Sequence, residues 1–217
     1  MFKKILNTSV LGVSVLGAMA ANAAAPGVYV TGQVGYANTQ MGNKTDTANL
    51  LHNKDKAEAN NLSNNGLAGR LALGYQFNQN FAVEVGYLQL GQRKVNVLVS
   101  PEQSSLKLRQ NALDLVGKGI IPVSNNIDVY GKLGVAYLTS DIKETVKEGG
   151  HSTTTYDLND VARVNKHQWA PEAAIGVTYD ITPNVSVDTS WTHIQPLGKN
   201  RPGNIDFVAV GLGYNFG

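Results

Sequence analysis

The chain has 217 residues and no cysteine, and its 18 lysine and arginine residues nearly balance 16 aspartate and glutamate residues. The length suits one domain of ordinary size, and the absence of cysteine excludes disulfides, thiolate metal sites and a cysteine nucleophile. The small net charge does not indicate a nucleic-acid partner.

The start of the chain has the pattern of a cleaved signal peptide. Two lysines precede an apolar run over residues 10–20, and Ala21-Asn22-Ala23 follows as a cleavage site. The run is shorter than the ~20 residues that a membrane-spanning helix needs. We therefore predict that residues 1–23 are removed and that residues 24–217 form one domain. No later apolar run is long enough for a helical span, so a mature chain in a membrane must cross it as strands.

The remaining chain consists of segments in which bulky apolar residues occupy every second position. In the last segment, Val208, Val210, Leu212, Tyr214 and Phe216 alternate with small or polar residues. A period of two predicts a strand with two different faces. Eight such strands are expected, at about residues 28–37, 67–77, 81–87, 106–121, 127–137, 167–180, 185–191 and 207–216.

The connections between these strands alternate between long and short. The long, polar ones cover residues 38–65, 91–105, 141–166 and 195–204. This alternation is typical of transmembrane barrels, which have short periplasmic turns and long extracellular loops. The sequence therefore predicts an all-β fold, an eight-stranded antiparallel transmembrane barrel with short periplasmic turns and four long extracellular loops.

One strand contains a change of parity. Within residues 106–121, Leu106 and Leu108 are out of phase with Leu113 and Leu115. A β-bulge would explain this shift, and so would an extension of the strand above the membrane.

Aromatic residues of the bulky face gather at the two ends of the expected strands, as in barrels whose girdles lie at the membrane interfaces. The long-loop end carries Tyr36, Tyr87, Tyr137, Trp169 and Trp191, and the short-turn end carries Tyr75, Phe77, Phe81, Tyr214 and Phe216.

The opposite face of the strands carries many glycines and a set of charged residues, namely Arg70, Glu84, Asp114, Lys118, Lys132, Glu172 and Asp188. A soluble lipid carrier is also an eight-stranded barrel, but its cavity would then be lined with unpaired charge. A membrane barrel with a polar lumen fits better. By distance from the short turns, Glu84, Lys118 and Asp188 lie at one depth. Arg70, Asp114 and Glu172 lie at a second depth nearer the outside, with Lys132 between.

An interior this narrow is filled by side chains, and buried charges have to pair. We therefore expect ion pairs that plug the lumen. The alternative is a gate, in which an exchange of partners opens a narrow ion path.

Several segments resemble the transmembrane domain of the outer membrane protein A family. They are residues 74–78 (Gly-Tyr-Gln-Phe-Asn), 84–87 (Glu-Val-Gly-Tyr), 118–122 (Lys-Gly-Ile-Ile-Pro), 126–130 (Asn-Ile-Asp-Val-Tyr), 179–183 (Tyr-Asp-Ile-Thr-Pro) and 211–217, which ends in Tyr-Asn-Phe-Gly. The resemblance covers the strands and short turns and fades in the long loops.

This resemblance implies an OmpA-like barrel whose lumen is closed by ion pairs. Glu84 and Lys118 stand at the positions of the family's central acid–lysine pair. Asp188 replaces the family's partner-exchanging arginine and Thr178 replaces its other acidic partner, so Lys118 would lie between two acids and the family's gate would not be intact. Because the chain stops at Gly217, we do not expect the family's periplasmic peptidoglycan-binding domain.

The four histidines do not indicate catalysis. His52 and His151 fall in polar loops, and His167 and His193 fall at the upper rim. An esterase acting on lipid A needs a nucleophile and a base on one face, but alternation places Ser190 on the face opposite to His193. We expect neither an enzyme nor a metal site nor a cofactor.

Function is expected at the long loops. Lys94, Lys107 and Arg109 lie at or above the outer rim, where cations can bind lipopolysaccharide phosphates.

We predict a monomer in the Gram-negative outer membrane that serves envelope structure and surface interaction; the alternative function is a narrow, porin-like ion channel. Its expected partners are outer-membrane lipids and lipopolysaccharide, the barrel-assembly machinery, which would read the terminal aromatic residue, and host surface molecules or complement factors.

Overall fold

The structure is a computed structural model, and it describes residues 26–40, 65–99, 102–148, 152–160 and 162–216. The predicted signal peptide and two of the histidines, His52 and His151, lie outside the described residues. Within the described ranges, no helix is long and apolar enough to cross a membrane.

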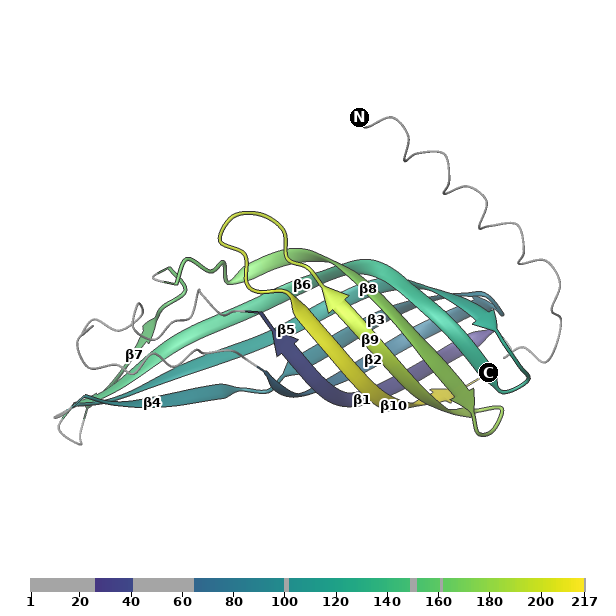
Figure 1. Cartoon of the computed structure of the whole chain (residues 1–217), viewed down its shortest axis with the longest axis horizontal. Helices are drawn as coiled ribbons and strands as arrows, with labels where there is room; N and C mark the ends of the chain where they lie inside the picture. The colour runs from purple at the N-terminus through teal and green to yellow at the C-terminus, as the bar shows by residue number, and fades with distance from the viewer. Residues whose placement is uncertain (1–25, 41–64, 100–101, 149–151, 161, 217) are drawn as a thin grey trace, which may run out of the picture.

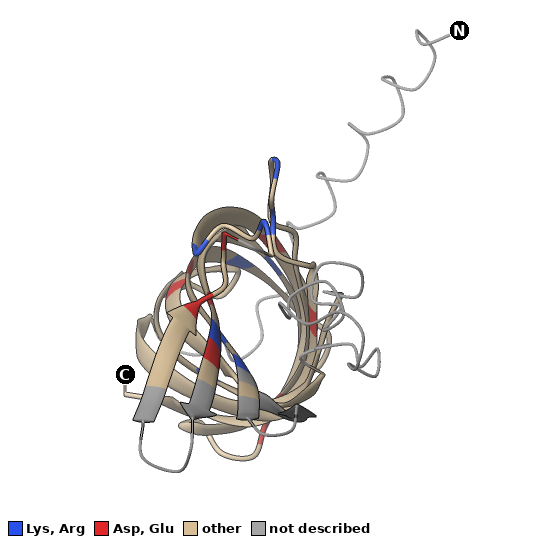
Figure 2. Cartoon of the chain, turned by 90° about the vertical axis from the view of Figure 1, so that its left-hand side faces the viewer, with Lys and Arg blue, Asp and Glu red and all other residues tan. Residues whose placement is uncertain are grey.

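The strands form one closed antiparallel sheet (Figure 1). The strands of the barrel are β1 (Gly27–Thr39), β2 (Gly66–Asn78), β3 (Phe81–Leu90), β5 (Glu102–Pro122), β6 (Ile127–Glu148), β8 (His167–Asp180), β9 (Val185–Ile194) and β10 (Ile205–Asn215). Strand β1 pairs with β10, and β5 pairs with both β3 and β6, so the sheet closes on itself. Figure 2, at right angles to Figure 1, shows the resulting ring of strands. The predicted eight-stranded barrel is confirmed.

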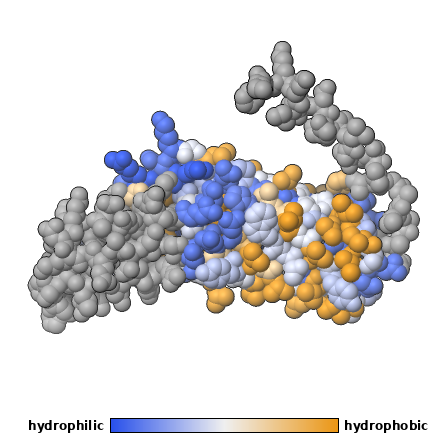
Figure 3. Space-filling model, viewed as in Figure 1, coloured by the Kyte–Doolittle hydropathy of each residue, from blue (hydrophilic) through white to orange (hydrophobic). Residues whose placement is uncertain are grey.

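The two faces of the barrel wall differ as the alternation predicts. In β3 every second residue is exposed, from Phe81 to Gln89, and every residue between them is buried. Leu67, Leu133 and Val34 on the outer face are 79%, 73% and 67% exposed. Figure 3 shows apolar side chains spread over the outside of the barrel. A soluble carrier would need a wetted outer face, so this wall is suited to lipid.

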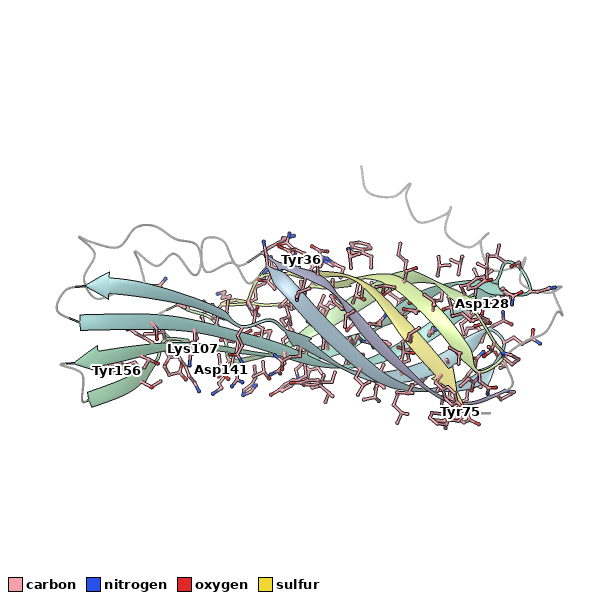
Figure 4. All side chains as sticks on the ribbon, turned by 90° about the horizontal axis from the view of Figure 1, so that it is seen from below. Tyr36, Tyr75, Lys107, Asp128, Asp141 and Tyr156 are labelled. Atoms are coloured by element: carbon pink, nitrogen blue, oxygen red, sulfur yellow. The ribbon has the colours of Figure 1, made fainter. Side chains whose placement is uncertain are left out.

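The outward aromatic residues lie near the two ends of the barrel. Tyr36 and Tyr75, labelled in Figure 4, lie near opposite ends. Neighbouring rings touch within each set: Tyr137 and Trp169 have centroids 5.0 Å apart, and those of Tyr214 and Phe216 are 4.9 Å apart. Such rings suit the two membrane interfaces.

The short turns are stabilised by their own side chains. The Asn78 side-chain oxygen accepts hydrogen bonds from the backbone N–H groups of Asn80 and Phe81, at 2.9 and 3.0 Å. The Thr182 hydroxyl does the same for Asn184 and Val185, at 3.3 and 3.0 Å. Asn and Thr favour turns because of such bonds.

Strands β5 and β6 are much longer than a membrane crossing requires. They have 21 and 22 residues and pair in continuous register from Gln103–Lys147 to Pro122–Asp128. The parity change near Leu108 therefore marks an extension of the strand and not a bulge. Two further strands, β4 (Arg93–Val99) and β7 (Ser152–Asp157), pair with the outer parts of β5 and β6. We call the sheet formed by β4, β7 and the outer parts of β5 and β6 the extension (Figure 4).

The extension corrects two of the expected connections. Residues 91–105 and 141–166 were expected to be polar loops, but they contain β4, part of β5, the end of β6, and β7. Their valines and threonines, as in Val95-Asn96-Val97 and Thr153-Thr154-Thr155, favour strands, and cross-strand pairing decides the outcome.

The chain after β7 folds back onto β6 at the base of the extension. The Asn159 side chain accepts a hydrogen bond from the backbone N–H of Ile142 at 2.9 Å and donates one to the carbonyl of Ser140 at 2.7 Å. Leu158 and Val164 are buried, as is Ile142. The loop after β9 joins this region through a bond from the Asn165 N–H to the carbonyl of Asn200, at 2.9 Å.

Candidate functional site

The lumen is centred on the carboxylate of Glu84, which projects inward from β3. Its side chain is completely shielded from solvent, at 0% exposure. One oxygen, Oε2, lies 2.7 Å from Lys132 Nζ and 3.3 Å from Arg70 Nη1. The other, Oε1, accepts a hydrogen bond from the Tyr29 hydroxyl at 2.8 Å and lies 3.8 Å from Lys118 Nζ. One carboxylate therefore joins side chains from β1, β2, β5 and β6.

Arg70 connects Glu84 to a second acid. Its Nη2 and Nε bind the two oxygens of Asp114 at 2.6 and 3.1 Å, which is a bidentate pair. Gly86 on β3 leaves room for this pair. A Cβ at Gly86 would lie 2.5 Å from Arg70 Nη2 and 2.6 Å from the Asp114 oxygens. We call Glu84, Arg70, Asp114, Lys118 and Lys132 the ion cluster.

Two inward tyrosines surround the cations of the ion cluster. Lys118 Nζ lies 4.2 Å from the ring centroid of Tyr130 and 5.5 Å from that of Tyr29. Lys132 Nζ lies 5.0 Å from the Tyr130 centroid. The faces of the rings attract these ammonium groups. Neither tyrosine was predicted as part of the site, although both occupy inward-facing positions of their strands.

Asp188 does not share the ion pairs of the cluster. It accepts hydrogen bonds from the Gln33 amide and, at 3.4 Å, from the Thr178 hydroxyl. Gln33 also donates to the Ser190 hydroxyl at 2.9 Å. The expected position of Lys118 between two acids is thus realised on one side only, because Lys118 forms an ion pair with Glu84 and not with Asp188.

Glu172, the last of the predicted lumen charges, is inside the barrel without an ion pair among the described residues. It is 4% exposed, and its Oε2 has no hydrogen-bond partner. Such an arrangement is unusual, because buried polar groups are almost always hydrogen-bonded.

An apolar layer fills the lumen between the ion cluster and the outer end. It consists of Ala37, Ala68, Leu88, Leu90, Ala112, Ala136, Leu138, Ala170, Ile194, Ile205, Phe207 and Ala209, none more than 6% exposed. We call it the outer apolar layer. This layer was not predicted, because the inward face of the strands is rich in glycine and charged residues and was expected to be polar throughout. The inward parity of Leu88, Leu138 and Phe207 at the long-loop ends would have revealed it.

The short-turn end of the lumen is hollow. A cavity of about 770 Å³ opens among the short turns, lined by Asn126, Thr182 and Asn184. It reaches inward as far as Tyr29, Lys118 and Asp188. We call it the vestibule. The lumen therefore has three levels: an open vestibule, the ion cluster and the outer apolar layer.

Neither of the two described histidines is hydrogen-bonded to a serine. His193 Nδ1 lies 2.7 Å from Asp206 Oδ1 on the outer face, whereas Ser190 is buried in the lumen. His167 Nδ1 lies 3.3 Å from the Thr139 hydroxyl. Among the described residues, no group of three histidine or acidic side chains could hold a metal ion.

The predicted lipopolysaccharide contacts lie in the extension. Lys107 on β5 is paired in register with Lys94 on β4 and with Lys143 on β6, and Arg109 is paired with Asp141. These positions lie beyond the girdle residue Tyr137, which pairs with Leu113.

Asp141, the register partner of Arg109, forms an ion pair with Lys166. Lys166 Nζ lies 3.0 Å from Asp141 Oδ1, and this carboxylate raises the pKa of the Lys166 ammonium. Lys94, Lys107 and Lys143 lie side by side on three neighbouring strands, and the next residue in this row, on β7, is Asp157, which pairs with Lys143.

Sequence comparisons relate this chain to outer-membrane proteins. The family model for the OmpA-like transmembrane domain matches residues 23–217. A protein of Coxiella burnetii is 30% identical over 90% of this chain and 87% of its own length. Outer membrane protein A of Salmonella typhi is 27% identical over 84% of this chain but only 48% of its own length. Outer membrane protein P5 of Haemophilus influenzae is 28% identical over 66% of this chain and 42% of its own length. The chain thus spans less than half of these two named relatives.

Solved structures share the fold. Ail, the attachment invasion locus protein of Yersinia pestis, in complex with the heparin analogue sucrose octasulfate, has a TM-score of 0.50 and 15% identity, over 88% of this chain and 99% of its own. Neisserial surface protein A has a TM-score of 0.50 and 18% identity, over 87% of this chain and 97% of its own. OprG of Pseudomonas aeruginosa has a TM-score of 0.50 and 16% identity, over 90% and 98%. At such low identity the likeness concerns the fold alone.

Proposed function

Because the chain belongs to the OmpA-like transmembrane domain family and is a barrel of the Gram-negative outer membrane, we propose that it is a non-enzymatic barrel with a closed lumen. It contributes to envelope structure and interacts with other surfaces through its extracellular extension. Residues 1–23 are removed during export, and the barrel-assembly machinery inserts the remaining chain.

One observation carries this proposal: the lumen is filled at two successive levels. At the first, four side chains converge on Glu84, which has no exposed surface. At the second, Leu88, Leu138 and Phe207 are at most 1% exposed. An ion would have to break buried ion pairs and then cross an apolar constriction, and apolar constrictions oppose conduction.

The extension is the proposed interaction surface. Lys107 and Arg109 lie beyond the outer girdle, where their charges would meet the phosphates of lipopolysaccharide. The backbone of Lys94 adds a third position to this row. Ail, which has the same fold, was solved in complex with a heparin analogue. We include host surface molecules and complement factors among the partners that the extension would contact.

The test is single-channel recording on purified protein in a planar bilayer. We expect no steady conductance from the wild type. Replacing Phe207 and Leu138 together with alanine should open the apolar constriction and produce brief conductance events. Leu133→Ala, on the lipid-facing wall, is the matched control and should stay silent.

A narrow ion channel is the second candidate, and the vestibule favours it, because water can reach Lys118 from the periplasmic end. The same recordings separate the two functions. A steady wild-type conductance that changes when Lys118 is replaced by methionine would contradict the closed lumen.

A further inference from the structure

Glu172 differs from every other charged side chain in the barrel core. It projects inward from β8 and is 96% shielded, yet its Oε2 has no hydrogen-bond partner. The other acids in the same interior are satisfied: Glu84 by its cluster, Asp114 by Arg70, and Asp188 by Gln33 and Thr178.

The cations that face Glu172 are bound elsewhere. Arg70 on β2 directs three nitrogens at Asp114 and Glu84, and Lys132 on β6 lies 2.7 Å from Glu84. The remaining charged groups that face it are anions, Asp114 on β5 and Glu84 on β3. None of the cations of the ion cluster lies within ion-pair distance of Glu172.

Water does not offer an alternative partner from either end. Beside Glu172, its register partner on β9 is Ile194, and two residues towards the outer end of β8 is Ala170; both belong to the outer apolar layer and are 1% exposed. Towards the periplasm, the vestibule ends at Tyr29, Lys118 and Asp188, and Glu172 does not line it. An ionised carboxylate in such a place is strongly unfavourable and is neutralised instead.

We propose that Glu172 is a proton-binding site of the lumen: between the ion cluster and the outer apolar layer, its carboxyl group carries a proton at neutral pH. The proton makes the group a hydrogen-bond donor beside the anions Asp114 and Glu84, and it removes an unpaired negative charge from the apolar boundary. This inference rests on the closed lumen proposed above.

The proton also links closure of the lumen to pH. When it dissociates, the new carboxylate competes with Asp114 and Glu84 for Arg70 and Lys132. Raising the pH should therefore weaken the ion pairs of the cluster. Lowering the pH should leave them intact as long as Glu84 remains ionised.

Infrared spectroscopy of the protein in hydrated bilayers tests the site directly. The wild type should show the carbonyl band of a protonated carboxylic acid at neutral pH, and the band should disappear in Glu172→Gln. Asp188→Asn is the matched control and should retain it. Labelling all glutamates with ¹³C in the wild type identifies the band as a glutamate without any substitution, in case the variant does not fold.

Unfolding rates provide a second readout. In the wild type the rate should rise with pH, by at most about tenfold per pH unit because one proton is lost, and in Glu172→Gln this rise should be absent. A missing band at neutral pH, or a band that survives in Glu172→Gln, would overturn the proposal. So would stability that follows sodium concentration in place of pH, which would indicate a bound cation. A steadily conducting barrel that keeps the band would contradict the closed lumen alone.

Discussion

At the residue scale, the lumen depends on one shared acid. Glu84 has Arg70, Lys118 and Lys132 within 4 Å and accepts the Tyr29 hydroxyl as well. The three cations are buried or nearly so, and a buried charge without a partner is costly. Their stability inside the barrel is therefore tied to a single carboxylate.

This dependence predicts the effect of Glu84→Gln. The change preserves size but leaves Lys118 and Lys132 without a charged partner, so the free energy of unfolding should fall by about 3–5 kcal/mol. Urea unfolding in lipid vesicles, followed by tryptophan fluorescence, measures it. Asp188→Asn is the control, because Asp188 accepts only neutral donors, and its cost should stay near 1 kcal/mol. Equal losses in the two variants would contradict the central role of Glu84.

The alternation of residues predicts the orientation of the lumen side chains, and the family resemblance implies the pair of Glu84 and Lys118, which lie 3.8 Å apart; the remaining partners were not predicted. Alternation fixes which side of the wall Arg70 or Glu84 faces, because side chains alternate strictly along a strand. It does not determine that Lys132 reaches Glu84 while Glu172 stays unpaired. That choice depends on side-chain length and on register across the lumen.

At the element scale, the extension was predicted only in part: the sequence showed a change of parity in one strand but left two explanations for it. The parity change at Leu108 signalled either a bulge or a longer strand, and polar composition suggested loops around it. In the structure, β4 pairs with the outer part of β5 and β7 with the outer part of β6, so these residues form strands and not loops. Cross-strand pairing of this kind lies beyond what one segment's composition reveals.

The barrel should fold without the tip of the extension. We expect that replacing residues 93–106 and 144–156 with short turns preserves the barrel, because Leu108, Ile142 and Asn159 remain to close its outer end. Unheated protein should still migrate differently from heated protein on a detergent gel. Binding to cells should decrease at least tenfold, whereas binding to lipopolysaccharide through the retained Lys107 and Arg109 should decrease much less. The charge variant Lys107→Gln with Arg109→Gln, in the full-length extension, separates loss of charge from loss of the sheet.

At the scale of the whole molecule, the barrel differs at its two ends. The outer end is filled by the outer apolar layer, and the periplasmic end opens into the vestibule. Asp128, labelled in Figure 4, lies at this open end, and Lys107 lies in the extension at the other. Among the described residues, the lumen is thus open at the vestibule and filled by the outer apolar layer at the other end.

Thiol labelling can measure this asymmetry on a chain with no native cysteine. Ser186→Cys, in the vestibule, should react with a large, membrane-impermeant maleimide only after the outer membrane is opened. Thr155→Cys, exposed on β7, should react on intact cells. Labelling of both variants on intact cells would contradict either the orientation of the barrel or the closure of its outer end.

The length of β5 and β6 has a mechanical consequence for the cell surface. A tilted crossing uses ~9–11 residues, so about ten residues of each strand remain, and at ~3.3 Å per residue they add roughly 30 Å along the strands. Hydrogen-bonded sheet is stiffer than loop, so each copy acts as a short spacer that stands off from the lipid. A second surface that approaches the lipid beside the barrel would be held off by this spacer, and the spacer's length limits how close the two surfaces can come around it.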